Sequence, residues 1–396
     1  MAAIDDSTLK QLIGFRDEIG VLSVYIGFTP EQAADPQPVT PIEIKNQLRD
    51  LRRRLRDEEP HDRWQAVESR ISELEDNELA ALLDPKAHGR GRVMFAAIAG
   101  DRVETIALQM PFRERVVLDD TPFVRPLVAA HDEGRSAGVL VVSRQGARLL
   151  EWAVGQAEEL ETWQFEIGDA QVADIKSGPS FDNPQNQQRG MVNRERFEDR
   201  IDENRARFLR DVLTDVGTTI KDRGWDRLVV SGSPKIRDAS IEALPAHNGL
   251  RVLRADNDWE GLTPSEISDR AWPVLRSVHR EREIELVEIA KDRALSGGAG
   301  ALGMKKVCEA LNQGQVSHLL FQSDLEASGY STDEGTLHAE VSGSAAQAGF
   351  EMHEEPLFVE RLVEKVLEMG GQVTPVDDEA ADLLDDHDGI AAHLRW

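Results

Sequence analysis

Apolar positions recur with the spacings of strands and helices from the first third of the chain onward. Residues 21–28, VLSVYIGF, form an apolar run that predicts a buried strand. Three- and four-residue steps between apolar positions predict an amphipathic helix over residues 42–59. These positions are Ile44, Leu48, Leu51 and Leu55. A second helix is predicted over residues 64–83, and a hairpin that turns at Gly100-Asp101 follows it.

The middle third begins with strands and continues with a long helix. Residues 137–143, AGVLVVS, predict a strand, and turns at Gly146 and Gly155 extend it into a meander. The polar residues 176–193 are rich in turn formers and predict a mobile loop. Apolar residues at helical spacing then predict a long helix that ends at Gly224. They are Phe197, Ile201, Phe208, Val212, Val216 and Ile220.

The last third repeats a scheme of helix, glycine turn and short buried strand. It occurs in ALGMKKVCEALNQGQVSHLLF and again in PLFVERLVEKVLEMGGQVTPV. This alternation favours a three-layer α/β arrangement. We therefore predict a mixed α/β (α+β) fold with three domains. The predicted domains are an N-terminal α+β domain (1–133), a middle domain with a mixed sheet (134–273) and a C-terminal α/β domain (274–396).

Composition and charge exclude several function classes. The net charge of −27 disfavours DNA binding and nonspecific nucleic-acid binding through the whole surface, although local basic patches can still bind RNA. Arginine outnumbers lysine, which suits phosphate contacts and also follows from a GC-rich genome. The single cysteine, Cys308, excludes an internal disulfide and a cysteine-based zinc site. We expect no metal and no cofactor.

The chain lacks the apolar segments that membranes and secretion require. No run of about 18 apolar residues is present, so no membrane span is expected. The N-terminal stretch MAAIDDSTLK is acidic and has no apolar signal core. The expected compartment is the cytoplasm.

Several stretches, in this order, resemble the bacterial branch of the archaeo-eukaryotic peptide-chain release factor and Pelota superfamily. The first domain carries VLSVYIGFTP, IKNQLRDLRRRL and VVLDDTPFVRPLVAAHDE. The middle domain carries AGVLVVSRQGARLLEWAVGQAEELE and RERFEDRIDENRARFLRDV, and the last carries ALGMKKVCEALNQGQVSHLLF. The resemblance covers nearly the whole chain. It implies a first domain near the ribosomal decoding region and a middle loop directed at the peptidyl-transferase centre.

The catalytic tripeptide of that family, Gly-Gly-Gln, is not retained where the family pattern places it. The pattern puts the tripeptide four residues ahead of an Arg-Phe pair, here Arg196-Phe197, and those positions hold Gly190, Met191 and Val192. The family uses the glycines for close backbone approach and a backbone N–H to stabilise an oxyanion. Gln187 and Gln188, just upstream, could form a displaced version.

A Gly-Gly-Gln tripeptide does occur elsewhere, at residues 370–372. There it follows a predicted helix and precedes a predicted strand, and Gly314 ends the companion helix at the same place. We interpret Gly370 as a helix C-terminal residue with positive φ, not as a catalytic tip.

The predicted contacts with ribosomal RNA or tRNA lie ahead of, and at the start of, the long middle helix. They are Gln187, Gln188, Arg189, Gly190, Met191, Val192, Arg194 and Arg196. Arg52 and Arg53 are further candidates, for contact with the decoding region. Acidic residues alternate with the arginines, so a solvated face crossed by salt bridges remains an alternative in both places.

The resemblance predicts a ribosome-binding factor that occupies the A site of stalled or idle ribosomes, in rescue or hibernation, without peptide-release chemistry. Its partners would be ribosomal RNA, tRNA and a translational GTPase such as elongation factor Tu. Two alternatives remain. The chain could be a peptidyl-tRNA hydrolase or release factor that uses a diverged loop at residues 185–192. It could also be an acidic scaffold that binds a GTPase away from ribosomes.

Overall fold

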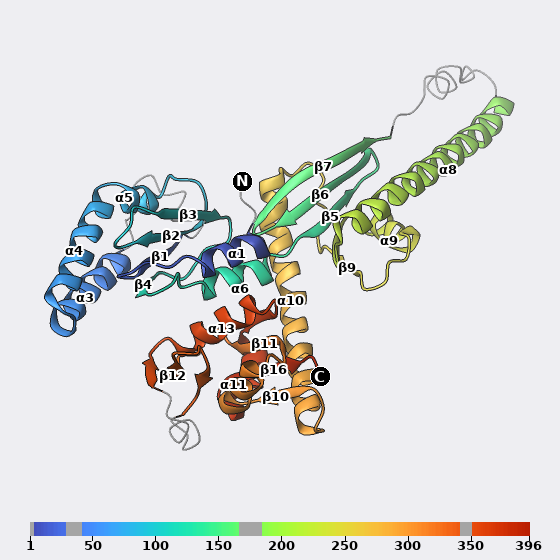
Figure 1. The fold of residues 1–396 in the computed structure, drawn as a ribbon. Coiled ribbons are helices and arrows are strands. Elements are labelled where there is room, and N and C mark those ends of the chain that lie inside the picture. The colour runs from blue at the N-terminus through green and yellow to red at the C-terminus, as the bar shows by residue number, and fades with distance from the viewer. Residues whose placement is uncertain (1–3, 29–41, 166–183, 341–350) are drawn as a thin grey trace. The chain divides into compact units, whose positions relative to one another are not determined.

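The chain folds into two compact units. The computed structural model describes residues 4–28, 42–165, 184–340 and 351–396, and of residue 6 and residues 184–202 it describes the backbone alone. Unit 1 joins Met1–Arg135 to Ser277–Trp396, and unit 2 is Ser136–Arg276. Both units combine helices with sheets (Figure 1), which confirms the predicted mixed α/β class. The division into three domains stays a prediction.

The N-terminal segment of unit 1 contains an antiparallel sheet of four strands in the order β3-β2-β1-β4. The strands are β1 (Val21–Gly27), β2 (Gly91–Ala97), β3 (Val103–Leu108) and β4 (Arg115–Asp119). The central strands β1 and β2 are almost wholly buried, as the apolar run at residues 21–28 predicted.

Helices pack their apolar sides against this sheet. They are α1 (Asp6–Ile13), α3 (Ile42–Glu58), α4 (His61–Asp76), α5 (Glu78–Leu83) and α6 (Arg125–Glu133). The predicted stripe of α3 is buried in the same core as β1. The second predicted helix is divided into α4 and α5, because Asn77 adopts a non-helical conformation with φ −129° and ψ −89°.

The C-terminal segment of unit 1 contains a second four-stranded sheet, in the order β10-β16-β11-β15. Its strands are β10 (Gly300–Leu302), β11 (Val316–Gln322), β15 (Gln372–Val376) and β16 (Ile390–Leu394). A small sheet adds β12 (Gly329–Thr332), β13 (Leu337–His338) and β14 (Met352–Glu355). The helical elements are α10 (Pro264–Leu295), which starts in unit 2, α11 (Met304–Asn312), α13 (Phe358–Glu368), α14 (Asp378–Asp382) and the 3-10 turn η1 (Asp385–His387).

Polar contacts join the two segments of unit 1 along α13. The buried Glu360 carboxylate accepts a hydrogen bond from the Val124 backbone N–H at 2.6 Å. Arg361 pairs with Asp119 and with Glu364, the latter at 2.6 Å. The end of β4 and the start of α6 are thereby held against α13 by buried charged groups.

Unit 2 is built on a five-stranded sheet in the order β7-β6-β5-β8-β9. Its strands are β5 (Ala137–Val142), β6 (Gly146–Ala153), β7 (Gln156–Gln164), β8 (Arg227–Gly232) and β9 (Arg251–Arg254). The predicted meander β5-β6-β7 is antiparallel, whereas β8 runs parallel to β5. The long helix α8 (Pro184–Arg223) buries apolar residues against β5, β6 and β8, and α9 (Pro234–Ala243) follows β8.

Two predicted features of the helices can be compared directly with the structure. Gly224, with φ +66°, directly follows the end of α8 as expected. Among the described helices, none is long and apolar enough to cross a membrane.

Candidate nucleic-acid interface

Helix α8 begins ten residues earlier than the sequence pattern predicted. The predicted loop spans residues 176–193, but α8 starts at Pro184, so residues 184–193 are helical. Proline suits a first helical turn, and glutamine, arginine and methionine favour helix, so one glycine at Gly190 costs only about 1 kcal/mol. Residues 176–183 lie outside the described residues.

The predicted RNA contacts ahead of Arg196 therefore lie on the first turns of α8. They are Gln187, Gln188, Arg189, Gly190, Met191, Val192, Arg194 and Arg196. Their side chains lie outside the described residues, so their role as contacts stays a prediction.

The second Gly-Gly-Gln tripeptide ends a helix, as interpreted from the sequence. Gly370 has φ +69°, and its N–H bonds to the Leu367 carbonyl at 3.0 Å. The Gly371 N–H bonds to the Val366 carbonyl at 2.8 Å, and β15 begins at Gln372. This pair of bonds is the usual way in which a helix ends on a left-handed glycine. The tripeptide is a tight turn between α13 and β15.

A recess opens in unit 2 at the carboxyl ends of the parallel strands β5 and β8. Arg144 stands two residues after β5, and Lys235 stands three residues after β8, in the first turn of α9. Strands β5 and β8 are paired in parallel from Gly138 with Leu228, so both ends lie at one edge of the sheet. We call this cavity of about 540 Å³ the sheet-edge recess. Ligands of α/β sheets characteristically bind at such edges.

Hydrogen bonds hold the strand ends that form this recess. The Ser143 N–H bonds to the Gly146 carbonyl at 2.9 Å and closes the turn that carries Arg144. The Phe165 N–H bonds to the Gln145 carbonyl at 2.8 Å, which fixes the residue that follows β7. The positions of Arg144 and Phe165 are thus set by the sheet.

Aromatic and cationic side chains from α8 and β7 form the wall of the recess. The rings of Phe165 and Phe208 lie 5.5 Å apart between centroids, at an interplanar angle of 59°. The Arg205 guanidinium stands over the Phe165 ring, 5.4 Å from its centroid. All three side chains are half-buried. Arginine stacked on an aromatic ring keeps its N–H groups available to phosphate, and the ring can stack on a base.

The charge of the sheet-edge recess is opposite to that of the chain. Its described lining includes Arg144, Arg205 and Lys235, and no aspartate or glutamate. The Ser233 side chain at the N-terminus of α9 forms no capping hydrogen bond. Helix N-termini favour phosphate because their first N–H groups lack intrahelical partners. In a chain with net charge −27, this recess is a local site suited to RNA phosphate.

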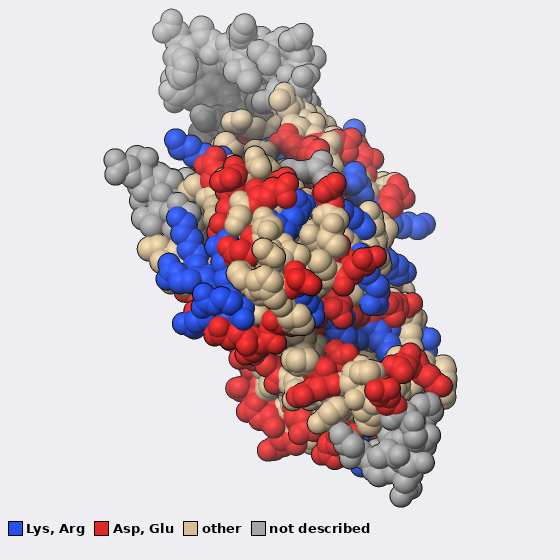
Figure 2. Space-filling model, turned by 60° about the vertical axis from the view of Figure 1, so that its left-hand side comes forward, with Lys and Arg blue, Asp and Glu red and all other residues tan. Residues whose placement is uncertain are grey.

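The candidate arginines of α3 differ in their surroundings. Arg52 lies 2.9 Å from Glu68 and 2.9 Å from Glu75, so it ties α3 to α4. A hydrogen bond from Glu75 and the charges of Glu75 and Glu68 outweigh burial and raise the pKa of Arg52. Arg53 is exposed and lies 2.9 Å from Asp50. Arg53 is therefore better placed to contact an external ligand. Basic and acidic side chains alternate over the face shown in Figure 2, with basic ones gathered at one margin.

The sheet-edge recess was not predicted from the sequence. Phe208 was assigned to the core side of a helix, and Phe165 to the end of a strand. A signal was present, because the apolar strand segments VLVVSR and RLVVSGSPK both end in serine followed by a cation. Only the parallel pairing of β5 with β8 brings these two cations together.

Comparison with known proteins assigns the middle of the chain to a family. Residues 122–283 match bacterial archaeo-eukaryotic release factor family 10, a span that includes all of unit 2. None of the curated proteins matches the chain.

Several solved structures of low identity are also similar to the chain. An archaeal translation termination factor, aRF1, is 17% identical, covers 100% of this chain and 99% of its own, and gives a TM-score of 0.25. Archaeal Pelota, from a model of ribosome-bound Pelota and ABCE1, is 16% identical over 100% of this chain and 95% of that chain, with a TM-score of 0.41. Pelota of Archaeoglobus fulgidus is 16% identical over 77% of this chain and 79% of that chain, with a TM-score of 0.36.

Proposed function

Because residues 122–283 relate this chain to the bacterial archaeo-eukaryotic release factors, we propose that it is a translation factor that binds the ribosome. It occupies the A site of stalled or idle ribosomes, in rescue or in hibernation. The family match is the observation that carries this proposal. The sheet-edge recess supports it, because three cations and two aromatic rings line a cavity without a carboxylate among its described lining.

Within unit 2, two neighbouring parts of one helix would contact RNA. The first turns of α8 carry the predicted contacts from Gln187 to Arg196, and the sheet-edge recess contains Arg205 and Phe208 further along the same helix. At 1.5 Å per residue, Arg196 and Arg205 are separated by roughly 14 Å along the axis. That distance spans a few phosphates of one RNA strand. Arg53 on α3 would supply a separate contact from unit 1.

Peptide release is not part of the proposed function. The positions that correspond to the family tripeptide hold Gly190, Met191 and Val192, and they fall within α8. A helical backbone uses its N–H groups internally, beyond the first turn, and does not present them to a developing oxyanion. The factor would occupy the ribosome without directing water at the peptidyl ester, and a translational GTPase would be the partner that delivers it.

Charge reversal in the recess tests ribosome binding. Arg144→Glu with Lys235→Glu should weaken co-sedimentation with ribosomes roughly tenfold or more, and the salt dependence should fall by about one unit per lost phosphate contact. Lys221→Glu is the control, because Lys221 is also exposed and lies at the other end of α8. Equal binding of both variants and the unmodified chain would refute the recess as an RNA contact.

The same assay extends to the start of α8 and to the alternatives. Arg194→Glu with Arg196→Glu should weaken co-sedimentation if the predicted contacts are correct. A chain that stays in the light gradient fractions of starved cells would instead be a scaffold for a GTPase. Single-turnover release from loaded ribosomes separates the hydrolase alternative. Peptide freed at a rate abolished by Gln187→Ala with Gln188→Ala would establish a release factor.

A further inference from the structure

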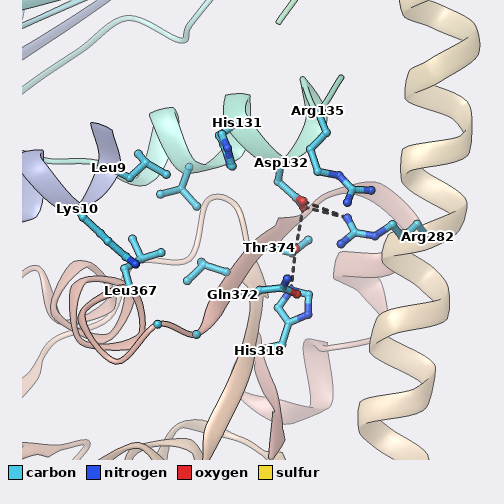
Figure 3. A pocket seen from close by; sticks show the side chains of 14 residues that line it. Leu9, Lys10, His131, Asp132, Arg135, Arg282, His318, Leu367, Gln372 and Thr374 are labelled. Atoms are coloured by element: carbon cyan, nitrogen blue, oxygen red, sulfur yellow. Dashed lines mark hydrogen bonds and ion pairs between the residues drawn. The ribbon is translucent and has the colours of Figure 1, made fainter. Parts of the chain in front are cut away.

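A second cavity lies in unit 1, where its N-terminal and C-terminal segments meet. Helices α1 and α6 form one side, and strands β11 and β15 with helix α10 form the other (Figure 3). The cavity has a volume of about 320 Å³. We call it the Asp132 cavity, after the carboxylate at its floor. Its size suits a small molecule and not a polymer.

The floor of the cavity is a buried hydrogen-bonded chain. The Asp132 carboxylate is 8% exposed and accepts hydrogen bonds from Arg282 Nη1 at 3.1 Å and from Thr374 Oγ1 at 2.7 Å. The Thr374 hydroxyl lies 2.9 Å from His318 Nε2. Because the only hydroxyl proton of Thr374 goes to Asp132, His318 must donate through Nε2–H. Burial alone would raise the pKa of Asp132, but Arg282, His279 and Thr374 outweigh it and hold the pKa low.

The histidine at the floor does not contribute a positive charge. Burial lowers the pKa of His318 to about 4, with further lowering by the nearby arginines that outweighs the opposing effect of Asp132. At neutral pH His318 is therefore an uncharged donor to Thr374. The charged side chains that line the cavity are Lys10, Arg135 and Arg282 against the single carboxylate of Asp132.

Two guanidinium groups converge at one end of the cavity. Figure 3 shows Arg135, from the end of α6, and Arg282, from α10, beside the same Asp132 carboxylate, with Lys10 entering from α1 on the opposite side. Both arginines act electrostatically on Asp132 and on His318. One carboxylate cannot neutralise two guanidinium groups, so the lining holds an excess of positive charge in a chain whose net charge is −27.

We propose that the Asp132 cavity binds a small anion that carries a phosphate group. Three cations against one carboxylate leave a formal excess of two positive charges, which a phosphate dianion neutralises. Guanidinium groups match phosphate oxygens in a bidentate geometry, and Asp132 fixes Arg282 in advance. The Thr374 and Gln372 side chains add uncharged polar groups at the wall.

Such a ligand would hold the two segments of unit 1 together. Lys10 and Arg135 belong to the N-terminal segment, whereas Arg282 and Thr374 belong to the C-terminal segment. An anion that contacts both sets binds only when the segments are docked, so it stabilises the docked state by mass action. This inference is independent of ribosome binding.

Titration calorimetry of the full chain with inorganic phosphate at neutral pH tests the proposal. One saturable site per chain is expected, and Arg135→Gln should weaken phosphate binding roughly tenfold or more because it removes one charged hydrogen-bonding group. Lys10→Gln should weaken it as well. Lys305→Gln, an exposed lysine of α11, is the control and should leave the affinity unchanged.

The choice of anion identifies the chemistry and its source. Acetate at the same ionic strength should bind far more weakly than phosphate. Glycerol 3-phosphate that binds more tightly than inorganic phosphate would indicate a phosphorylated metabolite, and equal affinity would indicate free phosphate. The proposal is overturned if phosphate shows no saturable binding, if acetate binds equally well, or if Arg135→Gln binds phosphate as the unmodified chain does.

Discussion

Replacing Glu360 by glutamine should stabilise unit 1 at neutral pH. Glu360 is fully buried where α13 meets the start of α6. Burial raises its pKa to about 8, and the charge of the neighbouring Glu364 raises it further than Val124, Arg125 and Arg361 lower it. Its Oε1 accepts the Val124 N–H, while Oε2 has no hydrogen-bond partner among the described residues. Glutamine keeps the Oε1 acceptor and cannot ionise.

The magnitude follows from the difference between the folded and unfolded pKa. Between the ordinary pKa of 4.5 and the folded value of about 8, the folded chain holds one proton more than the unfolded chain. The free energy of unfolding therefore falls as pH rises, by about 1.4 kcal/mol per pH unit. From pH 5 to pH 7 this amounts to roughly 2–3 kcal/mol. Glu360→Gln should be more stable than the unmodified chain by about that amount at pH 7, and equally stable below pH 4.5.

Pulse-labelling hydrogen exchange along a urea series, followed for the peptide that contains Val124, reports the unfolding of unit 1 at each pH. The comparison between proteins cancels other buried carboxylates such as Glu364 and Asp119, which titrate in both. Glu368→Gln is the control, because Glu368 is exposed on the same helix. If Glu360→Gln shows the same slope with pH as the unmodified chain, or is less stable at pH 7, the buried carboxyl does not carry the extra proton.

Two further predictions concern residues singled out by the sequence. Gly370→Ala should destabilise unit 1 by about 1 kcal/mol, because Gly370 has φ +69° and an alanine is strained there although no atom lies within 4 Å of its Cβ; denaturant midpoints measure this, and ribosome binding should be unchanged. Burial raises the pKa of the Cys308 thiol to about 12, so iodoacetamide at pH 8 should leave the folded chain unmodified and alkylate it only after unfolding, as intact mass would show; rapid alkylation of the folded chain would contradict the buried thiol.

The sequence was most informative where local spacing and burial coincide. The stripe from Ile44 to Leu55 specified α3, because all four of its apolar residues are buried in one core. Gly224, Gly314 and Gly370 each end a helix with positive φ, a conformation that glycine adopts at little energetic cost. The relationship to the release factors was also predicted, because its motifs are local stretches whose order along the chain can be read directly.

The sheet-edge recess and the start of α8 depended on information that is not local. Arg144 and Lys235 lie far apart in sequence, and only the parallel pairing of β5 with β8 places them at one edge. The Asp132 cavity likewise needs α6 and β15 to meet, since Asp132 and Thr374 belong to opposite ends of the chain. At the start of α8, turn-forming residues favoured a loop, but a helix that continues into a packed forty-residue segment extends through them.

The acidity of the chain and its proposed anion sites are compatible because they act over different distances. At physiological ionic strength, charges are screened beyond about 8 Å, so most of the net charge of −27 is weak at any one contact. Within a contact, the immediate lining decides, and both the sheet-edge recess and the Asp132 cavity have more cations than carboxylates. The acidic remainder then repels RNA that approaches through any other face. A polyanion is therefore accepted in few orientations, which is the property that a factor with one defined ribosomal site requires.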